Sequence, residues 1–353
     1  MDNEFLSDFR SKFGKESIMF LNDLFQPENI PGYVSTGSFA IDYIIGHPGL
    51  PMGRITEISG FFSSGKSTVA ASCIGQCQQN GGISILFDTE HSYIPKWTEL
   101  FHVDPEKLIL PQSYSLQEVC EHMVFLTNKV RESNPKNGVL IVWDSIAATP
   151  SQEEIDGEIT DHTVGLHARV ISKALRKLTS IIWDQKIAVL FINQLKEKPM
   201  GFGKSYGKIG GHAVNYHAAV QIELFRVQAA SEGITVKATA VKNKIATPFK
   251  QSTFRVDFST GIDDTDFITQ LALDKKIVEK KGGWYEYNGD KYRKGPKLFN
   301  EIAINIIEST FGKEYTSNYL LNRCYTEDTQ EQEDEKEAEV ESAVDDFEPV
   351  EVN

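Results

Sequence analysis

The sequence has few cysteines, no long apolar run and no excess of basic residues. Its four cysteines, Cys73, Cys77, Cys120 and Cys324, form no C-x-x-C pair and no dense framework, so reduced thiols are expected. The first twenty residues lack the basic segment and apolar core of a signal peptide. No apolar stretch approaches the roughly 18 residues that span a bilayer. These absences argue against a disulfide-rich secreted protein and a membrane protein, and they predict a cytoplasmic location without membrane contact.

The formal net charge of −14 at first argues against a nucleic-acid partner. However, residues 327–353 hold thirteen acidic residues and one lysine, so the rest of the chain carries only −2. A block of like charge without apolar periodicity predicts a disordered acidic tail. Such a tail either only improves solubility or competes with nucleic acid for a basic surface elsewhere on the protein. The net charge of the whole chain therefore does not exclude a nucleic-acid partner.

The pattern of apolar segments indicates an α/β fold. Continuous apolar runs at 54–60, 83–88, 139–145 and 187–194 alternate with helical patterns near 66–80, 115–133 and 166–185. This alternation predicts a central, mostly parallel sheet that is flanked by helices. Beyond residue 211, strand-like runs follow one another too closely for helical crossovers, so they are expected to extend the sheet in antiparallel fashion.

Composition shifts divide the chain into four segments. Residues 1–32 are expected to form a short N-terminal helix and strand arm with a linker, and residues 33–262 the main α/β core. Residues 263–326 are expected to form a small C-terminal α+β domain, followed by the acidic tail at 327–353.

The tripeptide Gly-Lys-Ser occurs twice, and its first copy lies in a complete phosphate-loop motif. The run "GFFSSGKS" matches G-x-x-x-x-G-K-[ST] at every fixed position, after a predicted strand and before a predicted helix. Backbone N–H groups in such a loop surround phosphates, and the helix N-terminus adds a favourable dipole. The predicted ATP-binding residues are Gly60, Phe61, Phe62, Ser63, Ser64, Gly65, Lys66, Ser67 and Thr68. Lys66 is expected to reach the β and γ phosphates, and the Ser67 hydroxyl to bind Mg²⁺.

Two carboxylates follow neighbouring predicted strands. Asp144 ends the run "VLIVWD", where a second Mg²⁺ ligand is expected, and Glu90 comes just after "ISILFD". Ligands bind at the carboxyl edge of open α/β sheets, so both side chains are expected beside the phosphates. Glu90 is then placed to orient and deprotonate the attacking water. A strand-terminal cap for Asp144 and a plain surface position for Glu90 are the alternatives.

The second Gly-Lys-Ser, at residues 203–205, fails as a phosphate loop. Lys198 stands where the motif requires glycine, and nine residues separate Gln194, at the end of the predicted strand, from Lys204. The segment 195–211 instead combines five glycines with four lysines and the aromatic residues Phe202 and Tyr206. This composition suits single-stranded nucleic acid, whose phosphates pair with lysine and whose bases stack on aromatic rings. A disordered surface loop is the alternative.

A second candidate loop, 153–165, leads into a helix with bases at helical spacing. Arg169, Lys173, Arg176 and Lys177 recur on one predicted face. The sequence alone leaves open whether this face is only solvated or follows a nucleic-acid backbone.

Several of these segments together resemble the RecA recombinase family, in order and in spacing. They are "STGSFAIDYIIGHPGLPMGRITEISGFFSSGKST", "FDTEH", "IVWDSIAA", "VGLHARVISKALRKL", "LFINQ", "GGHAVNYHA" and "VKNKIATPFKQSTF". The resemblance covers about residues 10 to 325. It implies an Mg²⁺-dependent ATPase that forms helical filaments on single-stranded DNA, pairs it with a homologous duplex and exchanges strands.

The resemblance also implies roles for individual residues. The adenine is expected beside Trp97, the Mg²⁺ side is served by Asp144 and Ser145, and Gln194 senses the γ-phosphate. Lys242 and Lys244 are implied to act in catalysis on the ATP of a neighbouring protomer. The implied DNA-binding residues are Val164, Gly165, Arg169, Arg176, Lys196, Lys198, Phe202, Lys204, Gly210, Gly211 and His212.

Four positions depart from the family pattern, in three places. Ile94 and Trp97 replace an aspartate and a tyrosine near the adenine, Asn215 replaces a lysine, and Val164 replaces a methionine. The Asn215 change removes a cation that is implied at the protomer interface. It therefore leaves open a DNA-binding scaffold with negligible turnover as an alternative to the recombinase. A ring-forming motor on the same core is the other alternative, but the segments "KFGKESIM" and "VKNKIATPF" favour head-to-tail filament contacts instead.

Overall fold

The computed structural model describes residues 3–18, 30–158, 165–197, 206–208, 212–293 and 296–321. Its helices are α1 (Asn3–Phe13), α3 (Phe39–Ile45), α4 (Lys66–Gln79), α5 (Pro95–Thr98), α6 (Leu116–Ser133), α7 (Gln152–Asp156), α8 (Leu166–Ile182), α9 (His212–His217), α10 (Thr265–Asp274), α11 (Pro296–Phe311) and α12 (Lys313–Leu321), with 3-10 turns η1 (Lys15–Ser17) and η3 (Glu99–Phe101). Its strands are β1 (Tyr33–Val34), β2 (Leu50–Pro51), β3 (Arg54–Gly60), β4 (Ile83–Asp88), β5 (Leu108–Ile109), β6 (Val139–Asp144), β7 (Ile187–Glu197), β8 (Tyr206–Lys208), β9 (Val220–Ala229), β10 (Gly233–Asn243), β11 (Gln251–Asp257), β12 (Gly261–Asp263), β13 (Glu279–Lys281), β14 (Trp284–Tyr287) and β15 (Asp290–Tyr292).

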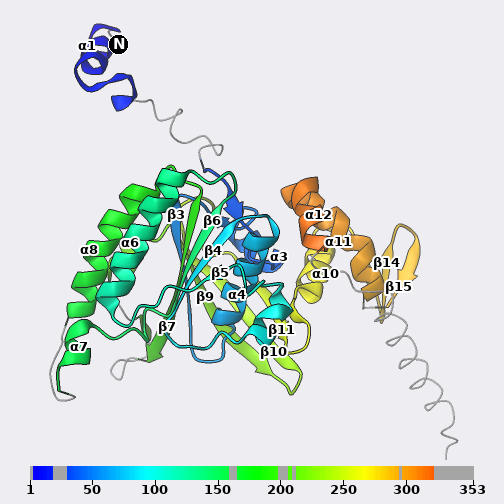
Figure 1. Ribbon diagram of the computed structural model, residues 1–353. Coiled ribbons are helices and arrows are strands. Elements are labelled where there is room, and N and C mark those ends of the chain that lie inside the picture. The colour runs from blue at the N-terminus through cyan, green and yellow to red at the C-terminus, as the bar shows by residue number, and fades with distance from the viewer. Residues whose placement is uncertain are drawn as a thin grey trace, which may run out of the picture.

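A ten-stranded mixed sheet forms the centre of the molecule (Figure 1). Its order is β12-β11-β10-β9-β3-β7-β6-β4-β5, and β8 pairs with β7 off this path. In this order, the neighbours β9, β3, β7, β6, β4 and β5 pair in parallel, whereas β10, β11 and β12 continue the sheet in antiparallel fashion. This confirms the predicted α/β class and the predicted antiparallel extension.

Helices cover both faces of the sheet because its buried strands are apolar on both sides. In β6, Leu140 and Val142 join a core cluster that also contains residues of α3 and α4. Ile141 and Trp143 face the opposite way and join residues of α6 and α8. This period of two follows from strand geometry. It explains why α6 and α8 lie side by side on one face in Figure 1.

Helix ends agree with local capping rules. A capping box starts α6, where Ser115 and Glu118 exchange side-chain to backbone hydrogen bonds. Another capping box, between Ser151 and Glu154, starts α7. Because of this second box, residues 152–156 are helical, and the part of the predicted loop 153–165 that they occupy is not a loop.

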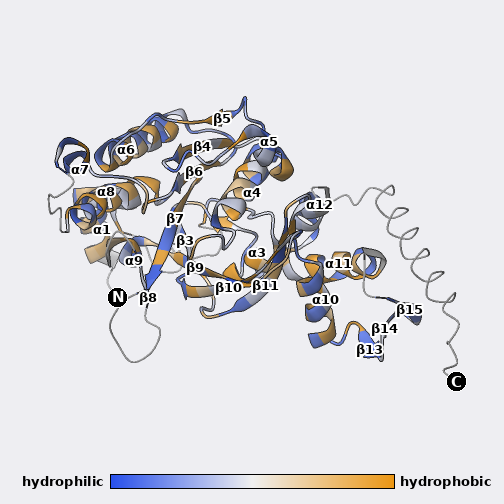
Figure 2. Ribbon diagram, turned by 90° about the horizontal axis from the view of Figure 1, so that it is seen from below, coloured by the Kyte–Doolittle hydropathy of each residue, from blue (hydrophilic) through white to orange (hydrophobic). Residues whose placement is uncertain are grey.

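β7 continues three residues beyond the predicted end at Gln194. Leu195, Lys196 and Glu197 pair with β8 in an antiparallel ladder. The prediction that residues 195–211 form one long loop is therefore wrong for two parts of this segment. Residues 195–197 belong to β7, and residues 206–208 form β8. In Figure 2 the end of β7 that leaves the sheet is coloured hydrophilic, in contrast to its apolar, buried first half.

A separate apolar cluster holds the C-terminal elements together. It contains residues of α10, α11, α12 and β14, beside a three-stranded sheet formed by β13, β14 and β15. Phe39 of α3 lies in this cluster, with ring centroids 5.8 Å from Phe311 and 6.1 Å from Phe267. Two buried carboxylates add polar contacts, since the hydroxyls of Tyr315 and Tyr319 donate to Asp42 and Asp264 at 2.8 and 3.0 Å.

The acidic tail at 327–353 lies outside the described residues.

Candidate functional site

The phosphate-loop motif occupies the turn between β3 and α4. Gly60 ends β3 and Lys66 begins α4, after Gly65 in the left-handed region at φ 83°. A side chain at Gly60 would meet Ser64 Oγ at 2.4 Å and the Leu224 carbonyl oxygen at 2.6 Å, so this position requires glycine. The N-cap residue Gly65 has no side chain to cap the first N–H groups of α4, which leaves them available to an anion.

Lys66 is held close to the loop and to two carboxylates. Its Nζ donates to the carbonyl oxygen of Phe61 at 2.8 Å. Burial lowers the pKa of Lys66, and the negative charges of Asp144 and Glu90 oppose that shift. The Lys66 ammonium group thus lies beside the backbone N–H groups that begin α4. It can exchange the Phe61 carbonyl oxygen for phosphate oxygens when a phosphate binds there.

Asp144 lies at the carboxyl end of β6, directly opposite Asp88 at the end of β4. Its side chain is buried, and the hydroxyl of Tyr93 donates to Asp144 Oδ2 at 2.9 Å. Burial raises the pKa of Asp144 to about 6, although hydrogen bonds from Ser67 and Tyr93 oppose that shift. Ser67 and Asp144 are thus neighbours, as the sequence predicted.

Glu90, Ser145 and Gln194 meet at the same edge of the sheet. Ser145 Oγ donates to Glu90 Oε1 at 2.6 Å, and Gln194 Nε2 donates to the same oxygen at 3.1 Å. Gln194 lies opposite Gly60 in the ladder between β7 and β3. The ends of β3, β4, β6 and β7 therefore bring the phosphate loop, the candidate base and the candidate sensor together.

Hydroxyl groups that the sequence analysis did not single out connect these strand ends. Thr89 Oγ1 donates to the Ser145 carbonyl oxygen and accepts from the Ser145 N–H, both at 3.0 Å. Tyr93 joins Asp144 to the segment that carries Trp97. A threonine directly before Glu90 was visible in the sequence, but the position of Tyr93 depends on a loop conformation that no local pattern predicts.

Trp97 lies in an aromatic stack next to the site. Its ring centroid is 5.5 Å from that of Tyr93 and 5.3 Å from that of Phe101, with edge-to-face geometry in both cases. Trp97 is partly buried, whereas Ile94 is 63% exposed. These side chains are apolar where they are exposed, so they could stack on the face of the adenine base but could not form a polar contact with its edge.

Lys242 and Lys244 bond to the last turn of α9 in their own chain. Lys242 Nζ donates to the carbonyl oxygen of Asn215, and Lys244 Nζ donates to that of Tyr216 at 3.3 Å. The Asn215 side chain accepts a hydrogen bond from Gln221 at 2.8 Å. In the described part of the chain, neither lysine has a hydrogen bond or ion pair with the phosphate loop.

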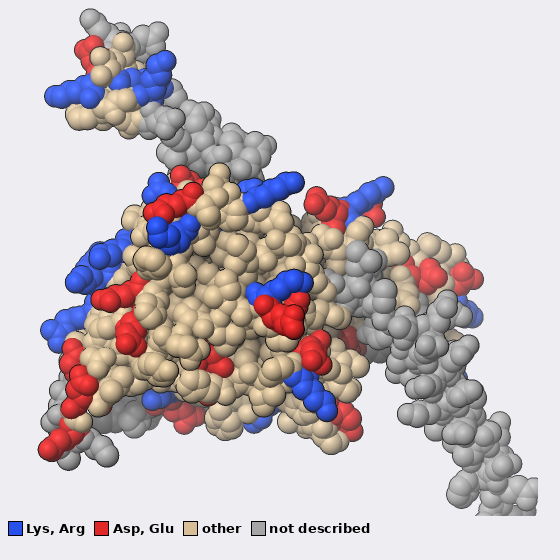
Figure 3. Space-filling view, viewed as in Figure 1, with Lys and Arg blue, Asp and Glu red and all other residues tan. Residues whose placement is uncertain are grey.

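The exposed face of α8 carries the predicted basic stripe. Arg169, Lys173, Arg176 and Lys177 are exposed, and apolar residues of the same helix are buried. Figure 3 shows Lys and Arg side chains along the edge of the molecule that α8 forms, with acidic side chains near α7. Gly165 is the N-cap residue of α8, Lys196 lies at the exposed end of β7, and His212 begins α9. The other predicted DNA contacts, Val164, Lys198, Phe202, Lys204, Gly210 and Gly211, lie outside the described residues.

Among the described residues, no group of three or more His, Cys, Asp or Glu side chains is arranged to hold a metal ion. None of the helices in the described ranges is both long and apolar enough to cross a bilayer.

Comparison with known proteins assigns the family. Residues 3–263 match the model of the RecA N-terminal domain. Protein RecA of Clostridioides difficile is 37% identical over 335 residues, which cover 92% of this chain and 93% of that protein. Protein RecA of Mesomycoplasma hyopneumoniae is 37% identical over 320 residues, covering 86% and 93%, and that of Mycoplasma mobile is 36% identical over 333 residues, covering 89% and 98%. The phosphate loop, the cluster of side chains at the strand ends and these matches agree, and the chain belongs to the RecA family of DNA-dependent ATPases that act in recombination and repair.

Proposed function

We propose that this chain binds Mg²⁺ and ATP at the carboxyl edge of its sheet and uses the nucleotide to control a filament on single-stranded DNA. The filament then pairs with a homologous duplex and exchanges strands. The observation that carries this proposal is the convergence of Lys66, Asp144, Ser145 and Gln194 on Glu90 and the phosphate loop.

The residues present fit a magnesium–triphosphate group. Backbone N–H groups of residues 60–68 and the Lys66 ammonium would hold the phosphates. Ser67 and Asp144 offer two hard oxygen donors side by side, and Mg²⁺ is usually held by one or two protein oxygens together with phosphates and water. When bound, the ion neutralises charge that develops on the phosphate oxygens. Trp97 and Ser145 would contact the nucleotide from either end of the site.

Glu90 would act as the base of hydrolysis. One oxygen of its carboxylate accepts from Ser145 and Gln194, which fixes its orientation, and Oε2 is the oxygen that would take a proton from water. The water oxygen attacks the γ-phosphorus while the bond from that phosphorus to the β–γ bridging oxygen breaks, so ADP leaves and phosphate forms. Gln194 would report the state of the γ-phosphate to the segment that follows β7.

Single-stranded DNA would bind along the segments 153–165 and 195–211 and along α8. The exposed face with Arg169 and Arg176 supplies cations for phosphates, and Lys196 lies where β7 leaves the sheet. A larger set, comprising Val164, Gly165, Lys198, Phe202, Lys204, Gly210, Gly211 and His212, is proposed to complete this contact.

Self-association into a helical filament would place Lys242 and Lys244 at the ATP of the next protomer. Both lysines now donate to neutral backbone carbonyl oxygens. If the lysines move away from these oxygens, no carboxylate is left without its cation. There they would supply positive charge in trans, as an arginine finger does.

One assay separates the recombinase from its alternatives. ATP hydrolysis is measured with and without single-stranded DNA, and the same samples are imaged for filaments. We expect hydrolysis that depends on DNA, together with open filaments. Hydrolysis that ignores DNA, or closed rings, would favour a ring motor, and filaments with negligible turnover would favour a nucleotide-switched scaffold.

A further inference from the structure

The three residues of β8 turn back toward the strand that leads into the phosphate loop. β8 pairs with the end of β7, so that Lys208 lies opposite Leu195 and Tyr206 lies opposite Glu197. Side chains two residues apart in a strand point to the same face, which puts Tyr206 and Lys208 together. Each of them contacts a residue on the phosphate-loop side.

The first contact is aromatic. The rings of Tyr206 and Phe61 are 5.0 Å apart between centroids, in an edge-to-face arrangement with an interplanar angle of 80°. Phe225 of β9 completes the group, 6.0 Å from Phe61 and 6.1 Å from Tyr206. All three side chains are partly buried. Such aromatic pairs contribute stability beyond the area that they bury, so this contact favours a docked β8.

Phe61 contacts β8 through its ring and the phosphate loop through its backbone carbonyl. Its ring packs on Tyr206, while its carbonyl oxygen accepts from Lys66 Nζ and from Ser64 Oγ, both at 2.8 Å. When Lys66 turns to phosphate oxygens, that carbonyl loses its charged donor. A change at the phosphate site therefore acts directly on the residue that holds Tyr206.

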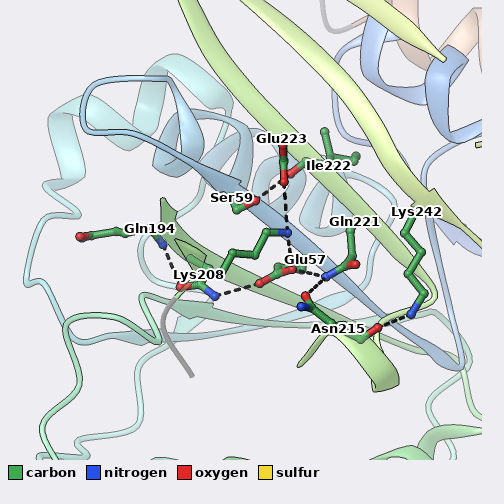
Figure 4. A network of polar contacts seen from close by, with 10 residues as sticks. Glu57, Ser59, Gln194, Lys208, Asn215, Gln221, Ile222, Glu223 and Lys242 are labelled. Carbon is green, nitrogen blue, oxygen red and sulfur yellow. Dashed lines mark hydrogen bonds and ion pairs between the residues drawn. The ribbon is translucent and has the colours of Figure 1, made fainter. Parts of the chain in front are cut away.

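The second contact is an ion pair. Lys208 Nζ lies 3.0 Å from Glu57 Oε2 and 3.6 Å from Glu223 Oε1 (Figure 4). Glu57 belongs to β3 and its side chain is fully buried, and that of Lys208 is 12% exposed. A buried carboxylate is costly unless it is both hydrogen-bonded and paired with a cation, so Glu57 favours the conformation in which Lys208 reaches it.

Neutral side chains complete the shell around Glu57. Asn193 Nδ2 donates to Oε1 at 2.8 Å. Gln221 Nε2 donates to Oε2 (Figure 4). Within the described ranges, Lys208 is the cation within ion-pair distance of Glu57. Asn193 Oδ1 also accepts from the N–H of Gln194 at 2.9 Å, so the same buried group adjoins the candidate γ-phosphate sensor.

We infer that the contacts Phe61–Tyr206 and Glu57–Lys208 form a clamp that holds β8 against the phosphate loop while nucleotide is absent, and that ATP binding weakens it. This inference rests on the proposed function, because it takes the phosphate loop as the ATP site and the segment around β8 as a DNA contact. The clamp is separate from the contact between Gln194 and Glu90. It makes DNA binding and ATP binding mutually favourable, since each favours the undocked β8.

The central test uses Tyr206→Ala. The affinity for a labelled oligothymidylate is measured by anisotropy with and without a non-hydrolysable ATP analogue and Mg²⁺, and the ratio of the two affinities reports the coupling. For the unchanged protein we expect the analogue to raise the affinity roughly fivefold or more. In Tyr206→Ala the ratio falls by roughly threefold or more. The fall comes from tighter binding without nucleotide, because the docked state has lost its aromatic contact.

The matched control is Tyr114→Ala. Tyr114 is 67% exposed and takes no part in the clamp, so its replacement leaves the ratio unchanged. An unchanged ratio in Tyr206→Ala would overturn the inference. A lower ratio that comes from weaker binding with the analogue would overturn it as well, since Tyr206 would then serve the nucleotide-bound state.

The ion pair is tested with the double variant Glu57→Gln/Lys208→Met, which removes both charges and leaves no buried carboxylate without a cation. Lys208 could also contact a DNA phosphate equally with and without the ATP analogue. Loss of such a contact would lower both DNA affinities by the same factor, so a change in their ratio reports the clamp alone. We expect the ratio to fall as in Tyr206→Ala, with Lys107→Met, an exposed lysine of a surface ion pair, as the control. A ratio equal to that of the unchanged protein would contradict the role of the pair.

The same samples distinguish a failed clamp from a failed function. ATP hydrolysis of the unchanged protein is measured with and without the oligonucleotide. If DNA stimulates hydrolysis and the variants keep the original ratio, the clamp is wrong and the proposed function stands. If DNA does not stimulate hydrolysis in the unchanged protein, the proposed function and the clamp are both wrong.

Discussion

Ser145 and Glu90 are separated by 55 positions in the sequence, yet the Ser145 hydroxyl donates to Glu90 Oε1 at 2.6 Å. Parallel pairing of β4 with β6 places the ends of these strands together and so produces this contact. Gln194 Nε2 reaches the same oxygen at 3.1 Å. The Glu90 carboxylate is therefore held by one of its two oxygens, and the other is the one that we assign to catalysis.

The first prediction concerns Glu90→Gln. Glutamine retains the shape and an oxygen that accepts from Ser145, but it cannot take a proton from water. We expect hydrolysis to fall by about 10²-fold or more, with ATP binding within about twofold of the original. Steady-state hydrolysis and titration with a fluorescent ATP analogue measure the two quantities. The exposed Glu106 supplies the control Glu106→Gln, and undiminished hydrolysis in Glu90→Gln would remove Glu90 from the base role.

The second prediction separates the two Gly-Lys-Ser tripeptides. Lys66→Ala removes the ammonium beside the phosphate loop and is expected to abolish hydrolysis. Lys204→Ala is expected to leave basal hydrolysis largely intact and to weaken DNA binding, since a phosphate contact is lost. Hydrolysis and oligonucleotide binding are measured on both variants. Loss of ATP binding in Lys204→Ala would show that the second tripeptide belongs to the nucleotide site after all.

The third prediction is a pH dependence at the proposed magnesium site. Burial raises the pKa of Asp144 to about 6, so the carboxylate is increasingly protonated as the pH falls below that value. A metal ligand must be deprotonated, and the affinity for Mg²⁺ and ATP together is therefore expected to fall as the pH decreases from 7 to 5. Calorimetric titrations across this range measure it. In Asp144→Asn the affinity should be weaker at pH 7 and lose most of this dependence. An unchanged slope would place the titrating group elsewhere.

Much of the proposed ATP site could be predicted as a place in the fold because its signals are local in sequence. The phosphate loop is one continuous motif, and the strand that ends at Asp144 is a continuous apolar run. Parallel pairing then brings Glu90 and Asp144 together without further information. The resemblance to a known family added the role of Gln194, which no pattern in this chain alone indicates.

The contacts of β8 could not be predicted in the same way. Composition alone does not distinguish Lys196 from Lys208, since both are lysines of one Gly-rich segment. The family resemblance implied a DNA contact for Lys196 and no role for Lys208. The structure separates them, because only Lys208 lies across from the buried Glu57. That difference depends on the extension of β7 beyond Gln194 and on its antiparallel return. Pairing of this kind is decided by tertiary contacts, and a glycine-rich segment gives little local preference for strand.

The fourth prediction concerns the acidic tail. Deletion of residues 327–353 removes about twelve negative charges net, which would otherwise compete with DNA for basic surfaces such as α8. We expect tighter binding to single-stranded DNA at low salt, and a smaller difference as salt screens the charges. A tail of the same length with its acidic residues changed to the corresponding amides is the matched control, and it should behave like the deletion. Equal affinities at low salt would contradict this role.

The last prediction concerns the contact between α3 and α12, where four donors surround one carboxylate. Asp42 accepts from Ser35 Oγ, from the N–H and Oγ1 of Thr36, and from the Tyr315 hydroxyl. Burial nevertheless dominates and raises the pKa of Asp42 to about 7 from its ordinary value of 3.8. The folded protein thus holds a proton that the unfolded chain releases near pH 4. The stabilisation that this proton provides is complete below pH 4 and is lost as the pH rises through 7.

Asp42→Asn keeps a neutral side chain at every pH and is therefore expected to lack this loss. The free energy of unfolding of the variant, relative to the unchanged protein, should increase between pH 4 and pH 7 by up to about 4 kcal/mol and change little above pH 7. Urea denaturation at a series of pH values measures this difference. Altered hydrogen bonds in the variant change its free energy of unfolding by the same amount at every pH. The dependence of the difference on pH is therefore what tests the prediction. The exposed Asp184 gives the control Asp184→Asn, and parallel curves for Asp42→Asn and the unchanged protein would show that Asp42 does not titrate in this range.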